Sequence, residues 1–199
     1  DKILSRLKDK IKFMKQKPGL AIVLVGSNPA SEIYVSSKKK MFSEVGGYAE
    51  LYNLDADTGE FELMKLVTQL NNNPKIHGIL VQLPLPKQID ENLITNSILP
   101  HKDVDGFTAV SLGRLMEDNA ILLPATARAV MHLIESTGMK IEGKNAVVVG
   151  RSNIVGKPVA LMLLEKNATV TVCHSKTKNM AEYTKKADIL VVAVGKPKL

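Results

Sequence analysis

A glycine-rich turn at residues 150–158 has the residue types of a dinucleotide-binding site. The apolar run that begins at Ala146 ends at Gly150, and Gly-x-Ser-x-x-x-Gly spacing then places Ser152 and Gly156 before a stretch with helical character. Small residues here let the backbone approach a pyrophosphate, and the start of the following helix supplies N–H groups. The spacing departs from Gly-x-Gly-x-x-Gly, so a plain strand–turn–helix unit with a glycine for close packing remains the alternative.

The end of the next predicted strand favours NADP over NAD. NAD-selective sites usually carry an acid about 20 residues after the glycine turn, where it holds the ribose hydroxyls. Here His174, Ser175 and Lys176 follow the strand, and Arg151 stands in the turn. An acid would repel a 2′-phosphate, whereas arginine and serine can form hydrogen bonds to it.

Tyr34 and Lys38 are four residues apart, so on a helix they share a face. The start signal at 28–31 follows the first predicted strand, which places this helix at a carboxyl end, where ligands bind in open α/β sheets. A lysine there can pass a proton if burial favours its neutral form. From spacing alone, a solvated basic face that includes Lys39 and Lys40 is the favoured interpretation.

Three other polar residues have a functional and a purely structural interpretation. Gln82 ends an apolar run before two prolines, and it can serve a site or cap a turn. Asp105 is the second acid before Gly106; it can bind the N–H edge of a heterocycle or belong to an acidic turn. Thr126 lies near the start of a predicted helix and can be its N-cap.

Apolar runs with strand character alternate with helix-like stretches. Strands are predicted at 20–26, 48–54, 78–83, 146–150, 168–173 and 189–195, and helices at 31–45, 58–71, 90–98, 126–136, 155–164 and 180–186. Short, apolar strands in this order predict α/β architecture with parallel sheets covered on both faces. Because the alternation stops between 99 and 123, we expect two lobes around a ligand cleft: a first domain at 1–124, a linking helix at 125–141, and a Rossmann-type dinucleotide-binding domain at 142–199.

Composition limits the class of protein. With 45% hydrophobic residues, the chain is globular rather than disordered. The single cysteine, Cys173, excludes an intramolecular disulfide and a thiolate zinc cage, so no metal is expected. No apolar run approaches the roughly 20 residues of a membrane helix, and the charged residues 1–17 lack a signal-peptide core, which favours a cytoplasmic or organellar protein.

The net charge of +7 leaves a nucleic-acid-binding α/β module as an alternative. We expect no nucleic acid, because the lysines are scattered among acids and the 4% aromatic residues offer few stacking platforms. A basic surface that serves small anionic ligands accounts for the charge equally well.

Six segments, in order over nearly the whole chain, resemble the bifunctional methylenetetrahydrofolate dehydrogenase/methenyltetrahydrofolate cyclohydrolase family. They are Gly26-Ser-Asn-Pro-Ala-Ser31, Tyr34-Val-Ser-Ser-Lys38, Gly78-Ile-Leu-Val-Gln-Leu-Pro-Leu-Pro86, Lys102-Asp-Val-Asp-Gly106, Gly150-Arg-Ser-Asn-Ile-Val-Gly-Lys-Pro158 and Val172-Cys-His-Ser-Lys-Thr177. The resemblance implies NADP-dependent oxidation of 5,10-methylenetetrahydrofolate and hydrolysis of the methenyl product to 10-formyltetrahydrofolate. It also implies a cytoplasmic homodimer that binds tetrahydrofolate derivatives in one-carbon metabolism and purine biosynthesis.

By match of position, the resemblance gives roles to individual residues. Lys38 would handle protons in the hydrolysis, Tyr34 would stack on or orient the folate, and Gln82 would form a hydrogen bond to Lys38. Asp105 would anchor the pterin ring. The implied NADP site comprises Gly150, Arg151, Ser152, Gly156, His174, Ser175 and Thr126, with Arg151 and Ser175 at the 2′-phosphate.

The sequence departs from the family in two places. Pro124-Ala-Thr-Ala-Arg-Ala129 stands where the family has Pro-Cys-Thr-Pro-x-Gly, which changes the nicotinamide side. The family also continues beyond the equivalent of Leu199 with further strands, a loop over the active site and a C-terminal helix. We therefore expect either a longer full protein or a version without its C-terminal part, and a monofunctional or inactive relative that only binds NADP or folate remains an alternative.

Overall fold

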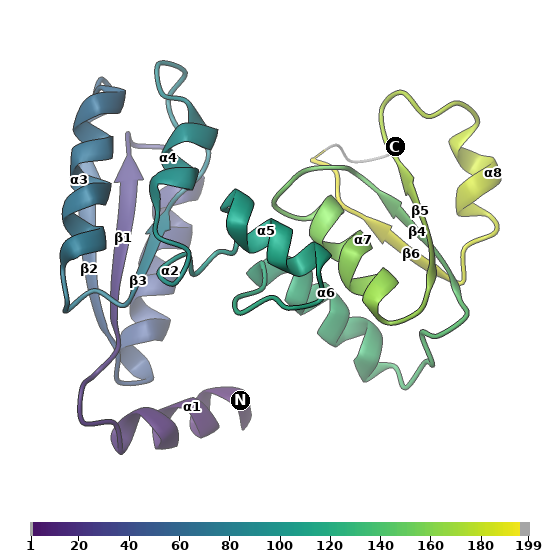
Figure 1. The fold of residues 1–199 in the computed structure, drawn as a ribbon, viewed down its shortest axis with the longest axis horizontal. Helices are drawn as coiled ribbons and strands as arrows, with labels where there is room; N and C mark the ends of the chain where they lie inside the picture. Colours follow the sequence, from purple (N-terminus) through teal and green to yellow (C-terminus); the bar gives the residue numbers. More distant parts are fainter. Residues whose placement is uncertain (1, 196–199) are drawn as a thin grey trace. The chain divides into compact units, whose positions relative to one another are not determined.

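The structure, a computed structural model, describes residues 2–195 (Figure 1). Its contacts divide the chain into two compact units, Asp1–Val104 and Asp105–Leu199. Each unit holds a three-stranded parallel sheet. The expected parallel α/β architecture is therefore confirmed, and the expected cleft stays a prediction.

The sheet of the first unit has the order β2-β1-β3. Its strands are β1 (Gly19–Val25), β2 (Tyr48–Leu54) and β3 (Gly78–Val81). Every residue of β1 and β3 is buried, which explains why their sequences are continuous apolar runs rather than alternating ones. The helices are α1 (Lys2–Lys12), α2 (Pro29–Glu44), α3 (Glu60–Asn72) and α4 (Glu91–Ser97).

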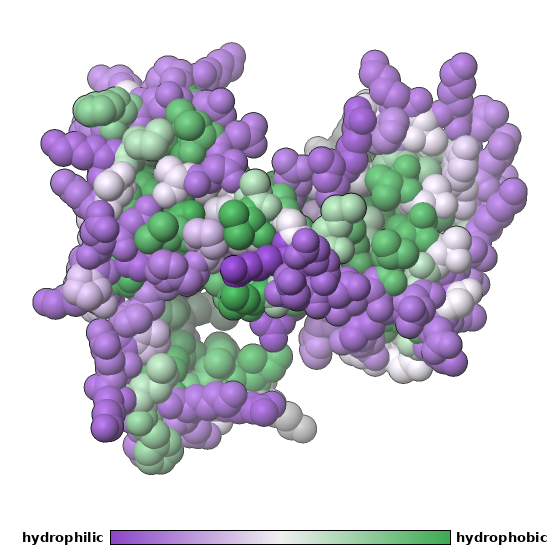
Figure 2. All heavy atoms as spheres, in the orientation of Figure 1, coloured by the Kyte–Doolittle hydropathy of each residue, from purple (hydrophilic) through white to green (hydrophobic). Residues whose placement is uncertain are grey.

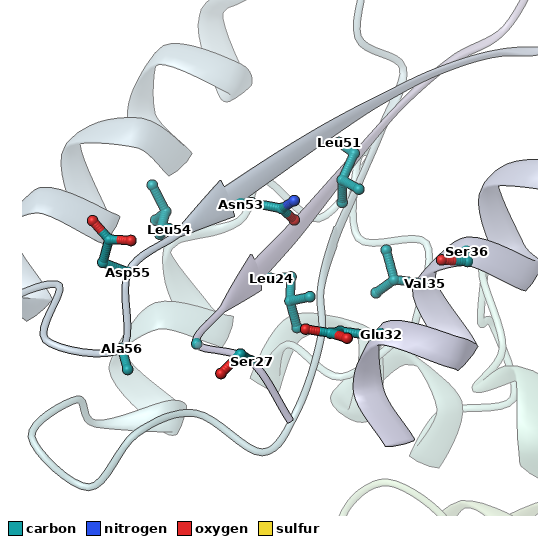
Figure 3. Close-up of a pocket in the computed structure, with 11 residues that line it drawn as sticks. Leu24, Ser27, Glu32, Val35, Ser36, Leu51, Asn53, Leu54, Asp55 and Ala56 are labelled. Carbon is teal, nitrogen blue, oxygen red and sulfur yellow. The ribbon is translucent and has the colours of Figure 1, made fainter. Parts of the chain in front are cut away.

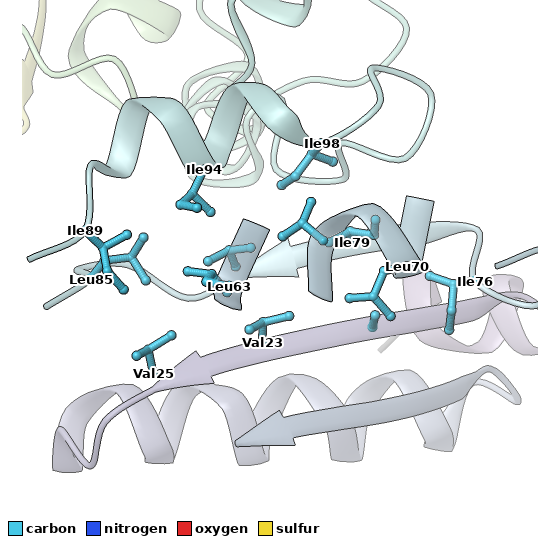
Figure 4. Close-up of a cluster of buried hydrophobic side chains, with 13 residues drawn as sticks. Val23, Val25, Leu63, Leu70, Ile76, Ile79, Leu85, Ile89, Ile94 and Ile98 are labelled. Carbon is cyan, nitrogen blue, oxygen red and sulfur yellow. The ribbon is translucent and has the colours of Figure 1, made fainter. Parts of the chain in front are cut away.

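Helices cover both faces of this sheet. Val23 and its alternate neighbours on β1 pack with Leu63 of α3 and Ile94 of α4 (Figure 4). Ile22 points to the opposite face and packs with Val35 of α2. The two-residue period of a strand sorts these side chains, so β1 supports a helix layer on each side.

The second unit repeats this plan with the order β5-β4-β6. Its strands are β4 (Asn145–Val149), β5 (Thr169–Cys173) and β6 (Ile189–Val192), and its helices are α5 (Ala109–Met116), α6 (Ala125–Ser136), α7 (Gly156–Glu165) and α8 (Met180–Thr184). Val148 packs with α6 and α7, whereas Val149 shares a cluster with Met180 of α8 on the other face.

Two helices were not predicted. The first, α1, is highly charged, and of its apolar residues Ile3, Leu4, Leu7 and Ile11 only Ile11 is buried, with Leu4 half-buried. The second, α5, lies in the stretch that lacks strand character, and Thr108 caps it by accepting a hydrogen bond from the Ser111 N–H at 3.1 Å.

The expected linking helix packs inside the second unit, because Ala127 and Met131 of α6 belong to the same core cluster as α7. The domain limits expected from the sequence stay a prediction.

Candidate active site

In each unit the first strand lies between the two that follow it. In each sheet the chain goes from the first strand to one edge and then crosses to the other edge, so the direction of the strand order reverses beside β1 and beside β4. Such topological switch points are where open α/β sheets bind ligands. Gly26 follows β1 and Gly150 follows β4, so the sequence motifs lie at both switch points.

Lys38 and Gln82 come together in the first unit. The Lys38 ammonium nitrogen donates a hydrogen bond to Oε1 of Gln82 over 3.2 Å. Asn28 starts α2, since its Oδ1 accepts from the N–H groups of Ala30 at 3.0 Å and Ser31 at 3.2 Å. The third turn of this helix then carries Lys38 to the edge of the sheet where β3 ends, and its side chain is half-buried there.

The orientation of the Gln82 amide is fixed by the chain around it. Its backbone N–H donates to the Val23 carbonyl at 2.8 Å, and its Nε2 donates to the Leu83 carbonyl at 2.7 Å. Because the NH₂ group is directed to Leu83, the amide oxygen faces Lys38. The strand predicted at 78–83 is two residues shorter than expected, since the chain turns at Gln82 after Val81.

A clamp that sequence reasoning missed holds the loop after Gln82. Glu91 Oε1 accepts from the Leu85 N–H at 2.9 Å, and Gln88 Nε2 donates to the Ala56 carbonyl at 2.7 Å. The second contact joins residues 32 positions apart in sequence. The run Leu83-Pro-Leu-Pro86 signals a turn, but no local pattern identifies its distant partners.

The structure places the remaining predicted folate residues as follows. Tyr34 lies one helical turn before Lys38 and is 63% exposed, so its ring is open to a ligand. Asp105 is half-buried and begins the second unit. Thr126 is exposed in the first turn of α6, whose N-cap is Pro124, so the N-cap interpretation of Thr126 is wrong.

The glycine turn of the second unit fits a dinucleotide. A Cβ on Gly156 would lie 2.3 Å from the Gly150 carbonyl oxygen and 2.9 Å from the Arg151 nitrogen. Gly150 itself has φ of 129°, and a Cβ there would lie 2.4 Å from the Ala193 carbonyl oxygen. Only glycine permits this close approach of α7 to the end of β4, which is the backbone cradle that a pyrophosphate needs.

The start of α7 differs from the expectation of free N–H groups. Ser152 Oγ accepts hydrogen bonds from the N–H groups of Val155 at 3.2 Å and Gly156 at 3.3 Å, and the Ser152 carbonyl accepts from Lys157 at 3.0 Å. Within the Gly-x-Ser-x-x-x-Gly turn, Ser152 thus accepts hydrogen bonds from three N–H groups at the start of α7. For these three amides the expectation is wrong, and the NADP contact of Ser152 stays a prediction.

The turn after β5 presents donors outward. Thr177 Oγ1 accepts from the His174 N–H at 2.8 Å, and His174 Nδ1 accepts from the Lys176 N–H at 3.1 Å. Ser175 is exposed at the tip of this turn, and Arg151 is exposed after the neighbouring strand β4. A hydroxyl and a guanidinium next to adjacent strand ends are the groups that a 2′-phosphate requires.

Two pockets lie elsewhere in these units. One, of about 450 Å³, lies near the ends of β1 and β2; its lining includes the apolar side chains of Leu24, Val35 and Leu51 and the carboxylates of Glu32 and Asp55 (Figure 3). It lies beside β2, whereas Gln82 follows β3 on the other side of β1.

The other pocket, of about 570 Å³, lies among Met180 of α8, Val149 of β4 and the exposed residues Leu190 and Val192 of β6. Apolar side chains also gather on the face of the second unit that Figure 2 shows. In the described part of the chain, none of the predicted site residues lines either pocket.

Among residues 2–195, none of the helices combines the length and apolar character needed to cross a bilayer. The same residues contain no group of three or more His, Cys, Asp or Glu side chains that could hold a metal ion.

Comparison with known proteins identifies the class. Residues 1–105 match the domain family described as "Tetrahydrofolate dehydrogenase/cyclohydrolase, catalytic domain". Residues 124–199 match the family described as "Tetrahydrofolate dehydrogenase/cyclohydrolase, NAD(P)-binding domain". The two α/β units thus correspond in order to a catalytic domain and an NAD(P)-binding domain. The chain belongs to the tetrahydrofolate dehydrogenase/cyclohydrolase family.

Individual relatives agree over nearly the whole chain. The bifunctional protein FolD of Moorella thermoacetica is 50% identical over 99% of this chain and 71% of its own length, and that of Acetivibrio thermocellus is 53% identical over 98% and 70%. The crystal structure of the Campylobacter jejuni FolD enzyme has a TM-score of 0.94 at 46% identity, covering 98% of this chain and 70% of that one. The Trypanosoma brucei enzyme, solved with NADP cofactor and inhibitor, has a TM-score of 0.93 at 36% identity, covering 98% and 69%.

The glycine cradle leads to a direct test. Gly156→Ala should weaken NADP binding at least tenfold, because the methyl group must push α7 away from the Gly150 carbonyl. Gly113→Ala in α5 is the matched control, since open space surrounds that position, and it should leave NADP affinity unchanged. Calorimetric titration measures both, and equal affinities in the two variants would contradict the cradle.

Proposed function

We propose that this protein oxidises 5,10-methylenetetrahydrofolate with NADP and hydrolyses the resulting methenyl group to 10-formyltetrahydrofolate. The observation that carries the proposal is the Lys38–Gln82 hydrogen bond at the carboxyl end of the first sheet. Family membership supports both activities, since the relatives are bifunctional proteins and one structure contains NADP. One-carbon units for purine biosynthesis, a homodimer and a cytoplasmic location belong to the same proposal.

The hydrolysis uses the amine of Lys38. Water adds to the cationic methenyl carbon, and the amine takes a proton from that water as the C–O bond forms. Beside a cation the neutral amine is favoured over the ammonium. A neutral amine that donates one N–H to Gln82 keeps its lone pair for the water proton, so the hydrogen bond orients the base. The bond from carbon to N5 then breaks as the hydroxyl of the adduct loses its proton to solvent and the protonated Lys38 returns a proton to N5, which leaves the formyl group on N10.

The hydride-transfer step depends mainly on how the protein binds and aligns NADP and the folate. NADP, when bound, accepts the hydride of the methylene carbon. Arg151 and Ser175 would hold its 2′-phosphate, and the Gly150–Gly156 turn would admit its pyrophosphate. Tyr34 would stack on the folate and Asp105 would anchor the pterin. Hydride transfer needs this alignment and requires no acid or base.

The first test separates Lys38 from its neighbour. Lys38→Met should reduce hydrolysis of methenyltetrahydrofolate by about 10²–10⁴-fold, the usual contribution of a general base. Lys39→Met removes the same charge from the exposed residue next to it and should leave the rate within twofold. Decay of the methenyl absorbance measures both rates. Equal rates in the two variants would remove Lys38 from the mechanism, and NADP binding without NADPH formation in the unmutated protein would indicate an inactive relative.

The second test concerns the cofactor. Arg151→Ala should weaken NADP binding by about 10–100-fold, the loss expected for a charge-assisted hydrogen bond, and leave NAD binding unchanged. Lys166→Ala, at the far end of α7, removes a charge away from the turn and serves as the control. Equal losses for NADP and NAD would contradict a 2′-phosphate contact.

A further inference from the structure

The ammonium group of Lys102 occupies the carboxyl end of α3. It donates hydrogen bonds to the carbonyl oxygens of Leu70 at 3.0 Å, Asn71 at 2.7 Å and Asn73 at 2.9 Å. A helix leaves its last carbonyls without partners, and its carboxyl end carries partial negative charge. An ammonium has three N–H groups, and here each has a carbonyl to receive it.

The backbone of the same segment is fixed to β3. The Lys102 carbonyl accepts from the Ile79 N–H at 2.8 Å, and the Lys102 N–H donates to Leu99 at 2.7 Å. Asp103 forms a parallel bridge with Ile79. Val104 fills the space over Gly78, where a Cβ would lie 2.3 Å from its Cγ1 atom. Residues 102–104 thus extend the sheet next to β3.

The direction of this segment is important for the site. Because the bridge is parallel, the chain leaves Asp103 in the direction in which β3 runs from Ile79 to Gln82. Asp105 is the residue that follows Val104. The placement of its backbone is therefore set by how residues 102–104 are held.

Capping the helix with Lys102 costs free energy, because a charged group is removed from water. Lys102 is only 7% exposed, and burial lowers the pKa of its ammonium group. An uncharged side chain or water could satisfy helix carbonyls without burying a charge. What the lysine adds is a link between α3 and a segment about 30 residues later in the chain.

We infer that Lys102 is a positioning residue for folate binding: by tying residues 102–104 to the end of α3, it sets where Asp105 meets the pterin. The inference rests on the proposed function, which assigns the pterin to Asp105. Lys102 touches no reacting atom, so its removal acts on substrate binding rather than on the chemical step.

The test compares Michaelis constants. Lys102→Met should raise the KM for 5,10-methylenetetrahydrofolate about tenfold, leave kcat within about twofold, and leave the Kd for NADP unchanged. Asn73→Ala is the structural control: it removes the 2.9 Å contact of its side chain with the Lys75 N–H at the same helix end but keeps the carbonyl that Lys102 binds. It should lower the melting temperature without raising this KM.

A double-mutant cycle shows whether the effect passes through Asp105. In an Asp105→Ala background, Lys102→Met should raise the KM no further. Additive effects would overturn the inference, as would an unchanged KM in Lys102→Met or an equal increase in Asn73→Ala. If Asp105→Ala alone leaves the KM unchanged, the pterin role in the proposed function fails instead. If Lys102→Met does not fold, Lys102→Arg replaces it in the cycle, because a planar guanidinium cannot direct its hydrogens to the same three carbonyls.

Discussion

The hydrogen bond from Lys38 to Gln82 is the interaction on which the proposed chemistry of the first unit depends. A lysine on α2 and an amide after β3 meet only if α2 packs on the face of the sheet that contains Ile22 and the chain turns at Gln82. The bonds of Gln82 to Val23 and Leu83 fix the amide oxygen, and the Gln88 contact holds the loop that follows. The amine is thereby held at a switch point, where a parallel sheet exposes its strand ends to ligands.

The two units use the same topology for different chemistry. In each, a buried first strand pairs with both later strands, and its carboxyl end receives the functional turn. The first unit adds a half-buried lysine, which suits proton transfer. The second adds the close backbone approach of Gly150 and Gly156 and exposed donors at Arg151 and Ser175, which suit a phosphorylated dinucleotide. Lys38, Arg151 and Ser175 lie outside the buried clusters, so these side chains are separable from the fold, whereas Gly150 and Gly156 also determine how α7 packs.

Sequence patterns predicted what local chemistry controls. The apolar runs identified β1 to β6, because buried parallel strands are continuously apolar, and the order of elements predicted both sheets. The charged α1 was not predicted, although Ile3, Leu4, Leu7 and Ile11 recur at helical spacing. The contacts of Ser152 are local, and a serine before a helix start is the signal that could have predicted them. The three carbonyl contacts of Lys102 could not be predicted, because they depend on which segments the fold brings together.

In the proposed hydrolysis the Lys38 amine takes a proton from water while the amide oxygen of Gln82 orients it. The sharpest measurement compares the rate of methenyltetrahydrofolate hydrolysis in Gln82→Met, which removes that oxygen, with the rate in Gln69→Met, which removes an exposed amide from α3. Gln82→Met should lower the rate by about tenfold, roughly the worth of one hydrogen bond, and Gln69→Met should leave it unchanged. Equal rates in the two variants would show that Gln82 does not orient the base.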